Sequence, residues 1–302
     1  MKKLIISAGT GFLGNVLVNY FEKEFNEIVI LTRGKASTTN NIRYVNWDAK
    51  TFSGWEKELE NSNVVINLAG KSVDCRYTEK NKAEIISSRI DSTRILNQAV
   101  LQCKNAPKHF INSSTATIYR HSEDKRMDEY TGEIGDNFSM NVAKEWEKIF
   151  YETKTPNTMK TALRTSIVLG KSGGAFIPLK KLTQLGFGGK NGSGKQFISW
   201  IHEKDFARAI AFVIEKEISG NINIVSPNPI RNEEFTKKLQ KAIGIPFGIP
   251  ISETLLTIGA TIIQTETELV LKSRNVIPKR LEENGFEFEF SDLDKTFKDL
   301  LS

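Results

Sequence analysis

A glycine-rich turn near the N-terminus constrains the fold of this chain more than any other feature of its sequence. The turn directly follows the apolar run 4–6, and it reads Gly9-Thr10-Gly11-Phe12-Leu13-Gly14. Glycines at this spacing let a strand turn sharply into a helix and leave room for a phosphate beside the helix N-terminus, where unpaired amides favour negative charge. The turn therefore predicts a dinucleotide site; the alternative is a tight strand–helix turn that binds nothing.

The residues about 20 positions further on distinguish one dinucleotide from another. An acidic side chain at the end of the second strand would accept hydrogen bonds from a ribose 2′-hydroxyl and select NAD. This chain has Thr32 and Arg33 there instead. Arginine can pair bidentately with a 2′-phosphate and stack on the adenine ring. These two residues predict NADP, and the alternative is that Arg33 is an ordinary exposed loop residue.

Two further segments are predicted to touch the cofactor. The small residues Ala69 and Gly70, with Leu68, end a strand where the backbone could lie along the ribose and adenine. Asp48, which follows another apolar segment, could accept a hydrogen bond from the adenine amino group. A simple surface loop is an equally good interpretation of Asp48.

The pattern of apolar residues predicts an α/β fold. Short, nearly continuous apolar runs at 4–6, 28–31, 64–68, 109–113 and 161–169 alternate with helical patterns at 79–101 and 141–152. Such runs are typical of parallel strands covered on both faces, and the alternation predicts a Rossmann-type doubly wound parallel sheet. We expect residues 1–170 to form this domain and residues 171–302 a smaller, integrated C-terminal α/β lobe, with helices near 205–216 and 232–243, a strand at 286–290 and a final helix.

Composition restricts the class of protein further. The net charge is +6, but the lysines are scattered and not interleaved with aromatic residues, so nucleic-acid binding is not expected. The two cysteines show no pairing pattern, and no metal-ligand spacing is present. No apolar stretch reaches the roughly 18 residues of a membrane span; the longest, at 255–263, suits an amphipathic helix. We expect a cytoplasmic protein.

Several motifs together resemble the extended short-chain dehydrogenase/reductases, and most closely their bacterial branch labelled "epimerase family". These motifs run along essentially the whole chain: the turn at 7–14, Asn67-Leu68-Ala69-Gly70, Ser113-Ser114-Thr115-Ala116-Thr117-Ile118-Tyr119, Ser199-Trp200-Ile201-His202 and Ser226-Pro227-Asn228-Pro229. The resemblance implies a nicotinamide cofactor, a sugar-nucleotide-like substrate and a homodimer.

The catalytic pattern of that family is incomplete in this chain. Its chemistry uses a Tyr-x-x-x-Lys pair on one helix face, in which the lysine lowers the pKa of the phenol. Lys144 occupies the lysine position, but Met140 stands at the tyrosine position, and a thioether cannot exchange a proton. By the resemblance, Lys144 still binds the nicotinamide ribose and Thr115 binds a substrate oxygen. We expect Met140 and Lys144 to face a covered pocket, opposite a core stripe of Val142 and Trp146.

A replacement proton donor is not obvious. Tyr119, His121 and His202 are the remaining candidates, and we assign the role to Tyr119, although a tyrosine just after a core strand is more often structural. The glycine-rich stretch 186–197, with Lys190 and Lys195, could receive an anionic ligand or form a surface loop. Two functions remain open: an NADP-dependent oxidoreductase or epimerase acting on a small, anionic or sugar-nucleotide-like substrate, and a protein that binds NADP without turnover.

Overall fold

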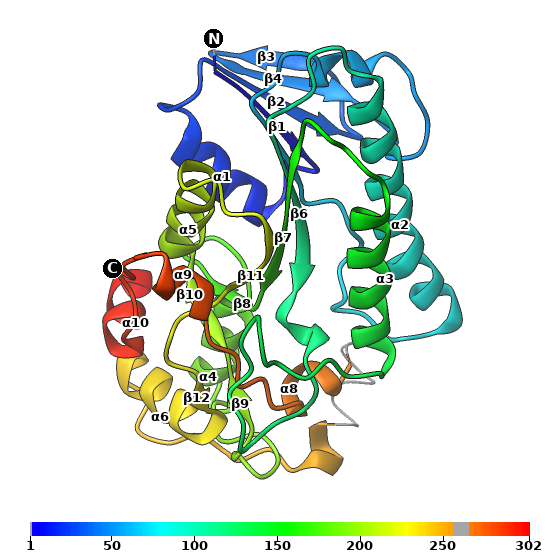
Figure 1. Ribbon diagram of the computed structural model, residues 1–302. Helices are drawn as coiled ribbons and strands as arrows, with labels where there is room; N and C mark the ends of the chain where they lie inside the picture. Colours follow the sequence, from blue (N-terminus) through cyan, green and yellow to red (C-terminus); the bar gives the residue numbers. More distant parts are fainter. Residues whose placement is uncertain (1, 257–265) are drawn as a thin grey trace.

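The central element of the structure, a computed structural model that describes residues 2–256 and 266–302, is an eight-stranded sheet (Figure 1). The strand order is β11-β7-β6-β5-β1-β2-β4-β3, and every pair is parallel except β3 with β4. The strands are β1 (Lys3–Ser7), β2 (Glu27–Thr32), β3 (Ser37–Thr39), β4 (Ile42–Asn46), β5 (Val64–Asn67), β6 (His109–Thr115), β7 (Met159–Thr165) and β11 (Gly220–Ile224). The fold is therefore the predicted doubly wound α/β type.

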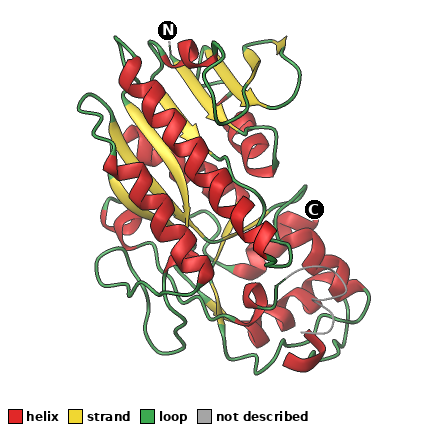
Figure 2. Ribbon diagram, turned by 90° about the vertical axis from the view of Figure 1, so that its right-hand side faces the viewer, coloured by secondary structure: helices red, strands yellow, loops and turns green. Residues whose placement is uncertain are grey.

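Helices cover both faces of the sheet. Helices α1 (Phe12–Phe21) and α5 (Glu203–Glu215) lie on one face, and α2 (Glu79–Gln102) and α3 (Phe138–Glu152) lie side by side on the other (Figures 1 and 2). Because successive side chains of a strand point to opposite faces, Leu4 and Ile6 pack toward α1 and α5, while Ile5 packs toward α2 and α3. All three side chains are fully buried, which explains the uninterrupted apolar run of this strand.

The order in which the chain adds strands to the sheet reverses at β1. From β1 the chain passes outward to β2 and β4, and it then returns to the other side of β1 through β5, β6 and β7. The carboxyl ends of β1 and β5 therefore diverge into loops that leave on opposite sides of the sheet. Ligands of doubly wound folds bind in the crevice at such a switch point.

A second group of elements packs beside the carboxyl edge of the sheet. Its apolar cluster includes Phe176, Trp200, Phe235 and Phe297. The remaining elements of the chain are the helices α4 (Phe176–Gln184), α6 (Asn232–Ile243), α8 (Glu268–Leu271), α9 (Lys279–Glu283) and α10 (Leu293–Leu301), the 3-10 helices η1 (Trp55–Leu59) and η2 (Ala116–Ile118), and the strands β8 (Ile167–Leu169), β9 (Phe197–Ile198), β10 (Trp200–His202) and β12 (Ile230–Arg231). The boundary near residue 170 stays a prediction; α5 and β11 return to the main sheet after it.

Two local predictions were not confirmed: one is wrong, and the other falls mostly outside the described residues. The alternating segment 286–290 is not a strand, because its amides are used elsewhere: those of Glu289 and Phe290 donate to the buried carboxylate of Asp205 at 3.1 and 2.7 Å. Its aromatic rings still pack inward, since Phe286 and Phe290 are buried. Most of the amphipathic helix predicted at 255–263 lies outside the described residues.

Candidate dinucleotide and substrate site

The glycine-rich turn has the geometry that a bound phosphate requires. Gly14 packs directly on the preceding turn, since a Cβ built on it would lie 2.2 Å from the carbonyl oxygen of Gly9. Gly11, which caps α1, has no neighbour within 4 Å of such an atom and is exposed. The Phe12 side chain packs away from this opening, against Gly170 and Gly173. The turn thus leaves open space beside the first turn of α1, where amides and the helix dipole favour an anion.

The end of β2 lies next to this turn. The amide of Ala8 donates to the carbonyl of Leu31 at 2.8 Å, which ties the two strand ends together. Thr32 is buried and its hydroxyl accepts a hydrogen bond from the amide of Gly34 at 3.1 Å. The Arg33 side chain is exposed at the edge of the sheet that carries the turn. The arrangement leaves the Arg33 guanidinium accessible to a ligand, and its pairing with a 2′-phosphate stays a prediction.

Asp48 is held by its own loop. Its carboxylate accepts hydrogen bonds from the amides of Lys50 and Thr51, both at 2.8 Å, and from the Thr51 hydroxyl at 2.6 Å. These bonds, led by the one from the Thr51 hydroxyl, lower the pKa of Asp48 to about 2. The carboxylate therefore shapes the loop after β4, and a contact with adenine stays a prediction.

A cavity of about 260 Å³ lies at the switch point. Its walls come from the strand ends of β5, β6 and β7, from the loop between β5 and α2, and from α2 and α3. The predicted residues Leu13, Leu68, Gly70 and Thr115 all line it. The complete lining is Leu13, Leu68, Gly70, Val73, Tyr77, Ile85, Arg89, Ser113, Ser114, Thr115, Thr117, Phe138, Ser139, Val142, Trp146, Thr165 and Ser166.

Thr115 lies where the sequence places it, at the carboxyl end of β6 and half-buried in the cavity wall. Its hydroxyl oxygen accepts a hydrogen bond from the amide of Thr117 at 3.1 Å, which starts η2. The hydroxyl hydrogen of Thr115 is not used in that bond. The side chain can therefore donate to an oxygen atom of a molecule in the cavity.

Helix α3 presents a different face to the cavity from the one predicted. Ser139, Val142 and Trp146 line it, at the spacing of three and four residues that defines one helix face. Met140 is buried against Gly135, where a Cβ would lie 2.0 Å from its sulfur. Lys144 is half-exposed and does not line the cavity, and its binding to a nicotinamide ribose stays a prediction. The predicted register was wrong because an apolar stripe can line a cavity as well as fill a core.

Tyr119, the predicted proton donor, lies in the interior of the protein. It is 2% exposed and does not line the cavity. Its hydroxyl donates to Asn223 at 3.0 Å and accepts from Arg164 at 2.9 Å, and burial raises the pKa of the phenol. These bonds join β11 and β7 to the segment after β6, and a role of Tyr119 as proton donor stays a prediction.

The two histidines considered beside it have structural contacts too. His202 is fully buried and stacks on Phe290 at 3.8 Å, its Nδ1 accepts from the amide of Lys204, and burial lowers its pKa to about 4. His121 is exposed on the surface and accepts from the amide of Ser273. Neither histidine lines the cavity.

A buried polar network holds the floor of the cavity. Asn67 donates to Asn112 at 2.7 Å and the indole of Trp146 donates to Thr93 at 2.9 Å, which connects β5, β6, α2 and α3. Nearby, Glu147 accepts two hydrogen bonds from the Arg164 guanidinium, at 2.8 and 2.7 Å. Buried polar groups that are satisfied in this way specify one arrangement of the surrounding elements.

Sequence reasoning missed two side chains of the cavity, Tyr77 and Arg89. Tyr77 lies in the loop before α2, in a segment with no regular pattern. Arg89 lies on α2, and its guanidinium stacks 4.9 Å above the Trp146 ring and donates to the carbonyls of Lys71 and Ile85. Burial lowers the pKa of Arg89 to about 10. A polar residue on the buried face of an otherwise amphipathic helix was the only sequence signal available for it.

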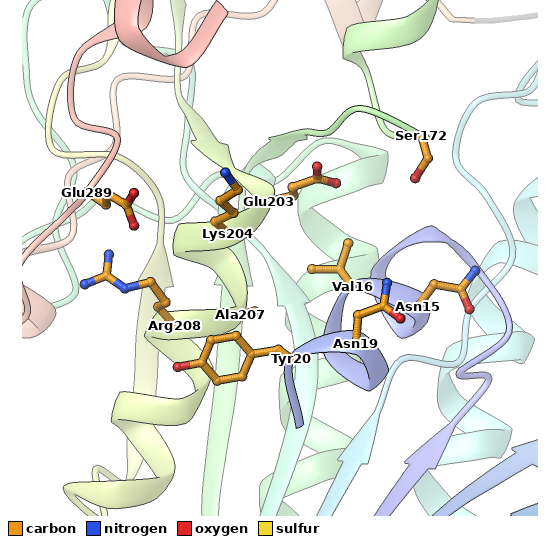
Figure 3. Close-up of a pocket in the computed structure, with 10 residues that line it drawn as sticks. All are labelled: Asn15, Val16, Asn19, Tyr20, Ser172, Glu203, Lys204, Ala207, Arg208 and Glu289. Atoms are coloured by element: carbon orange, nitrogen blue, oxygen red, sulfur yellow. The ribbon is translucent and has the colours of Figure 1, made fainter. Parts of the chain in front are cut away.

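A larger groove of about 440 Å³ lies on the other side of the sheet. Figure 3 shows Asn15, Asn19 and Tyr20 of α1 on one side of it, and Lys204 and Arg208 of α5 on another. None of the predicted site residues lines it. Residues 186–197, including Lys190 and Lys195, line neither of these two cavities; part of the stretch pairs with the segment at 249–251, through the amides of Gly192 and Ile251.

Membrane-spanning helices and metal-binding clusters are both absent from the described residues. Within residues 2–256 and 266–302, no helix is both long and apolar enough to cross a membrane. In the same part of the chain, no cluster of three or more His, Cys, Asp or Glu side chains could hold a metal ion.

The fold and site define a dinucleotide-binding protein of the Rossmann class: a doubly wound sheet, a glycine turn open to a phosphate, and a cavity at the switch point. Residues 4–225 match the NAD dependent epimerase/dehydratase family, and residues 255–300 match a domain of unknown function. The chain belongs to the NAD dependent epimerase/dehydratase family.

Known relatives extend along the whole chain. The epimerase family protein SAR0825 of Staphylococcus aureus is 35% identical over 100% of both chains, and the epimerase family protein YfhF of Bacillus subtilis is 32% identical over 99% of this chain and 98% of its own. The solved structure of the human epimerase family protein SDR39U1 with NADPH is 25% identical, with a TM-score of 0.88 over 99% of this chain and 98% of that one.

Proposed function

We propose that this protein is an NADP-dependent oxidoreductase or epimerase that acts on a small carbonyl compound or a sugar-nucleotide-like substrate. The observation that carries the proposal is the open space at Gly11 beside a strand end that offers Thr32 and Arg33 and no acidic residue. A 2′-phosphate is compatible with such a strand end, whereas an acidic residue would repel it. The similar human protein solved with NADPH supports the same cofactor.

The residues that would hold the cofactor follow from the site. Gly11 and the first amides of α1 would receive the pyrophosphate, Arg33 the 2′-phosphate, and Leu68 and Gly70 the ribose next to the cavity. A nicotinamide bound there would supply or accept a hydride. Thr115 would donate a hydrogen bond to the substrate oxygen, which orients the reacting carbon.

The cavity also favours an oxygen-rich or anionic substrate. Arg89 contributes a positive charge to its wall, and Arg89 has no carboxylate partner among the residues that the structure describes. A charge removed from water is costly unless it is paired, so a substrate carboxylate, phosphate or polarised carbonyl would stabilise it.

A second candidate function is cofactor binding without turnover. It is favoured by α3, whose cavity face carries Ser139, Val142 and Trp146 and lacks the tyrosine and lysine of active relatives. Such a protein would bind NADP through the same turn and respond to its redox state.

The first experiment is a calorimetric titration of the protein with NADPH and with NADH. We expect NADPH to bind at least about tenfold more tightly, because one charge-assisted pair contributes on the order of 1.5–3 kcal/mol. Equal or tighter binding of NADH would overturn the choice of cofactor. NADPH oxidation with a panel of aldehydes, ketones and keto-sugars then separates the two functions. A protein that binds NADPH and reduces no carbonyl compound would support cofactor binding without turnover.

A further inference from the structure

We propose that Tyr77 is the proton-carrying phenol of this site, in place of the tyrosine that α3 lacks. The inference rests on the proposed function, because it assigns the proton transfer that a carbonyl reduction needs. Tyr77 lines the same cavity as Thr115 and is half-buried there. Among the described tyrosines it is the one that lines this cavity.

The hydrogen bonds around Tyr77 fix which atom donates. The Tyr77 hydroxyl lies 3.4 Å from the Ser139 hydroxyl, and Ser139 itself donates its hydrogen to a carboxylate oxygen of Glu268 at 3.0 Å. A serine hydroxyl has one hydrogen, so Ser139 can only accept from Tyr77. The Tyr77 hydroxyl therefore carries a hydrogen that it can give either to Ser139 or to an oxygen atom in the cavity.

The backbone and ring of Tyr77 are also held in place. Its amide donates to Glu266 at 2.6 Å, and its ring packs edge-on against Phe138 with centroids 4.9 Å apart. Glu268 is the last member of the hydrogen-bonded series that runs from Tyr77 through Ser139. It forms an ion pair with Lys272 at 3.2 Å, which holds its carboxylate in place. The amino end of α3 and α8 lie beside each other at this place (Figure 1). These contacts hold the phenol in one position in the cavity wall, as a catalytic acid requires.

The charges that face the phenol have opposing effects. Burial raises the pKa of Tyr77 above its usual value, the Ser139 hydrogen bond lowers it, Glu268 and Glu266 raise it and Arg274 lowers it. The phenol is therefore protonated at neutral pH, which is the state of a proton donor. In the reduction of a carbonyl, a bound reduced nicotinamide would supply the hydride to the carbon, and the substrate oxygen, which gains the π electron pair, would take the Tyr77 proton. The phenolate then recovers a proton from water.

The test compares Tyr77→Phe with Tyr119→Phe, a matched loss of a hydroxyl from a tyrosine outside the cavity. The first readout needs no turnover: the alkaline titration of tyrosine absorbance with and without NADP⁺. A cationic nicotinamide near the phenol favours the phenolate, so NADP⁺ should shift the titration of one tyrosine to lower pH in wild type and in Tyr119→Phe, and not in Tyr77→Phe. A shift that survives in Tyr77→Phe, or no shift in a wild-type protein that binds NADP⁺, overturns the assignment.

The second readout is the rate with any carbonyl compound that the wild type reduces. Tyr77→Phe should lower kcat by about 100-fold or more, the usual contribution of a general acid, while the affinity for NADPH stays at the wild-type value. An unchanged kcat overturns the assignment and leaves the proposed function standing. A protein that binds neither NADPH nor NADP⁺ overturns both.

Discussion

Gly14 packs against the carbonyl of Gly9 so closely that a Cβ there would lie 2.2 Å from its oxygen, whereas Gly11 faces open space. The two glycines of one turn therefore serve different purposes. Gly14 closes the contact between the turn and α1, and Gly11 keeps a space that a pyrophosphate can enter.

Alanine substitutions should separate these two purposes. Gly14→Ala must displace the backbone of the turn. We therefore expect the unfolding free energy to fall by at least about 1–3 kcal/mol, the loss that overpacked cores show. Gly11 has a φ of −85° and open space at the position of a Cβ. Gly11→Ala should therefore keep the wild-type melting temperature without cofactor, while its affinity for NADPH falls. Thermal denaturation with and without NADPH measures both. Normal NADPH affinity in Gly11→Ala would show that the pyrophosphate does not lie at this glycine.

The ion pair between Glu147 and Arg164 predicts that the unfolding free energy depends strongly on these two side chains. Both side chains are buried, and Glu147→Gln would leave the guanidinium without a counter-charge. We expect a loss of about 3–5 kcal/mol in unfolding free energy, because a buried charge that loses its partner is strongly destabilising. The control is Glu145→Gln on the same helix, an exposed residue whose pair with Lys148 is worth about 0–1 kcal/mol. Equal effects of the two substitutions in urea denaturation would contradict the prediction.

Acid should destabilise this protein through its buried histidines. His109 donates through Nε2 to Thr161, since the Thr161 hydroxyl donates to the Ile218 carbonyl, and its buried Nδ1 has no hydrogen-bond partner. Burial lowers the pKa of His109 to about 4. The folded state thus binds fewer protons than the unfolded state between about pH 6.5 and 4, so stability falls as the pH is lowered through that window. Each pKa unit corresponds to about 1.4 kcal/mol, which gives a loss of about 2 kcal/mol per buried histidine between pH 7 and 5.

Denaturant titrations at pH 7 and pH 5 test this dependence. His109→Gln keeps a donor for Thr161 and removes the titrating group, so it should lose roughly half of the histidine contribution, the remainder belonging to His202. A pH dependence unchanged by His109→Gln would show that other groups cause it; Asp48 and Glu133, with pKa values of about 2, titrate below this window.

Whether a feature could be predicted from the sequence depends on how far apart in the chain its interacting residues lie. The glycine turn, the strands and the two long helices depend on local spacing and on apolar periodicity, and both are visible in the sequence. Tyr77 is placed by Glu266, 189 residues away, and Tyr119 is held in the interior by Asn223, 104 residues away. No local pattern encodes such partners. The face of α3 was assigned wrongly for a different reason: Val142 and Trp146 are apolar because they line the wall of a cavity, and periodicity cannot distinguish that wall from a packed core.

The position of Met140 gives the last prediction. If the missing tyrosine were the only defect of this site, Met140→Tyr would restore it. The structure indicates otherwise, because Met140 is buried against Gly135 and does not line the cavity. We expect Met140→Tyr to lower the unfolding free energy by about 1–3 kcal/mol through overpacking, with no gain in NADPH oxidation and no new NADP⁺-dependent phenol titration. Val142→Tyr is the matched comparison: it places the same ring on the cavity face of α3, where it should reduce NADPH affinity by filling the cavity. A gain of activity in Met140→Tyr would mean that α3 can present this position to the substrate, and that the phenol of the site belongs on α3 and not at Tyr77.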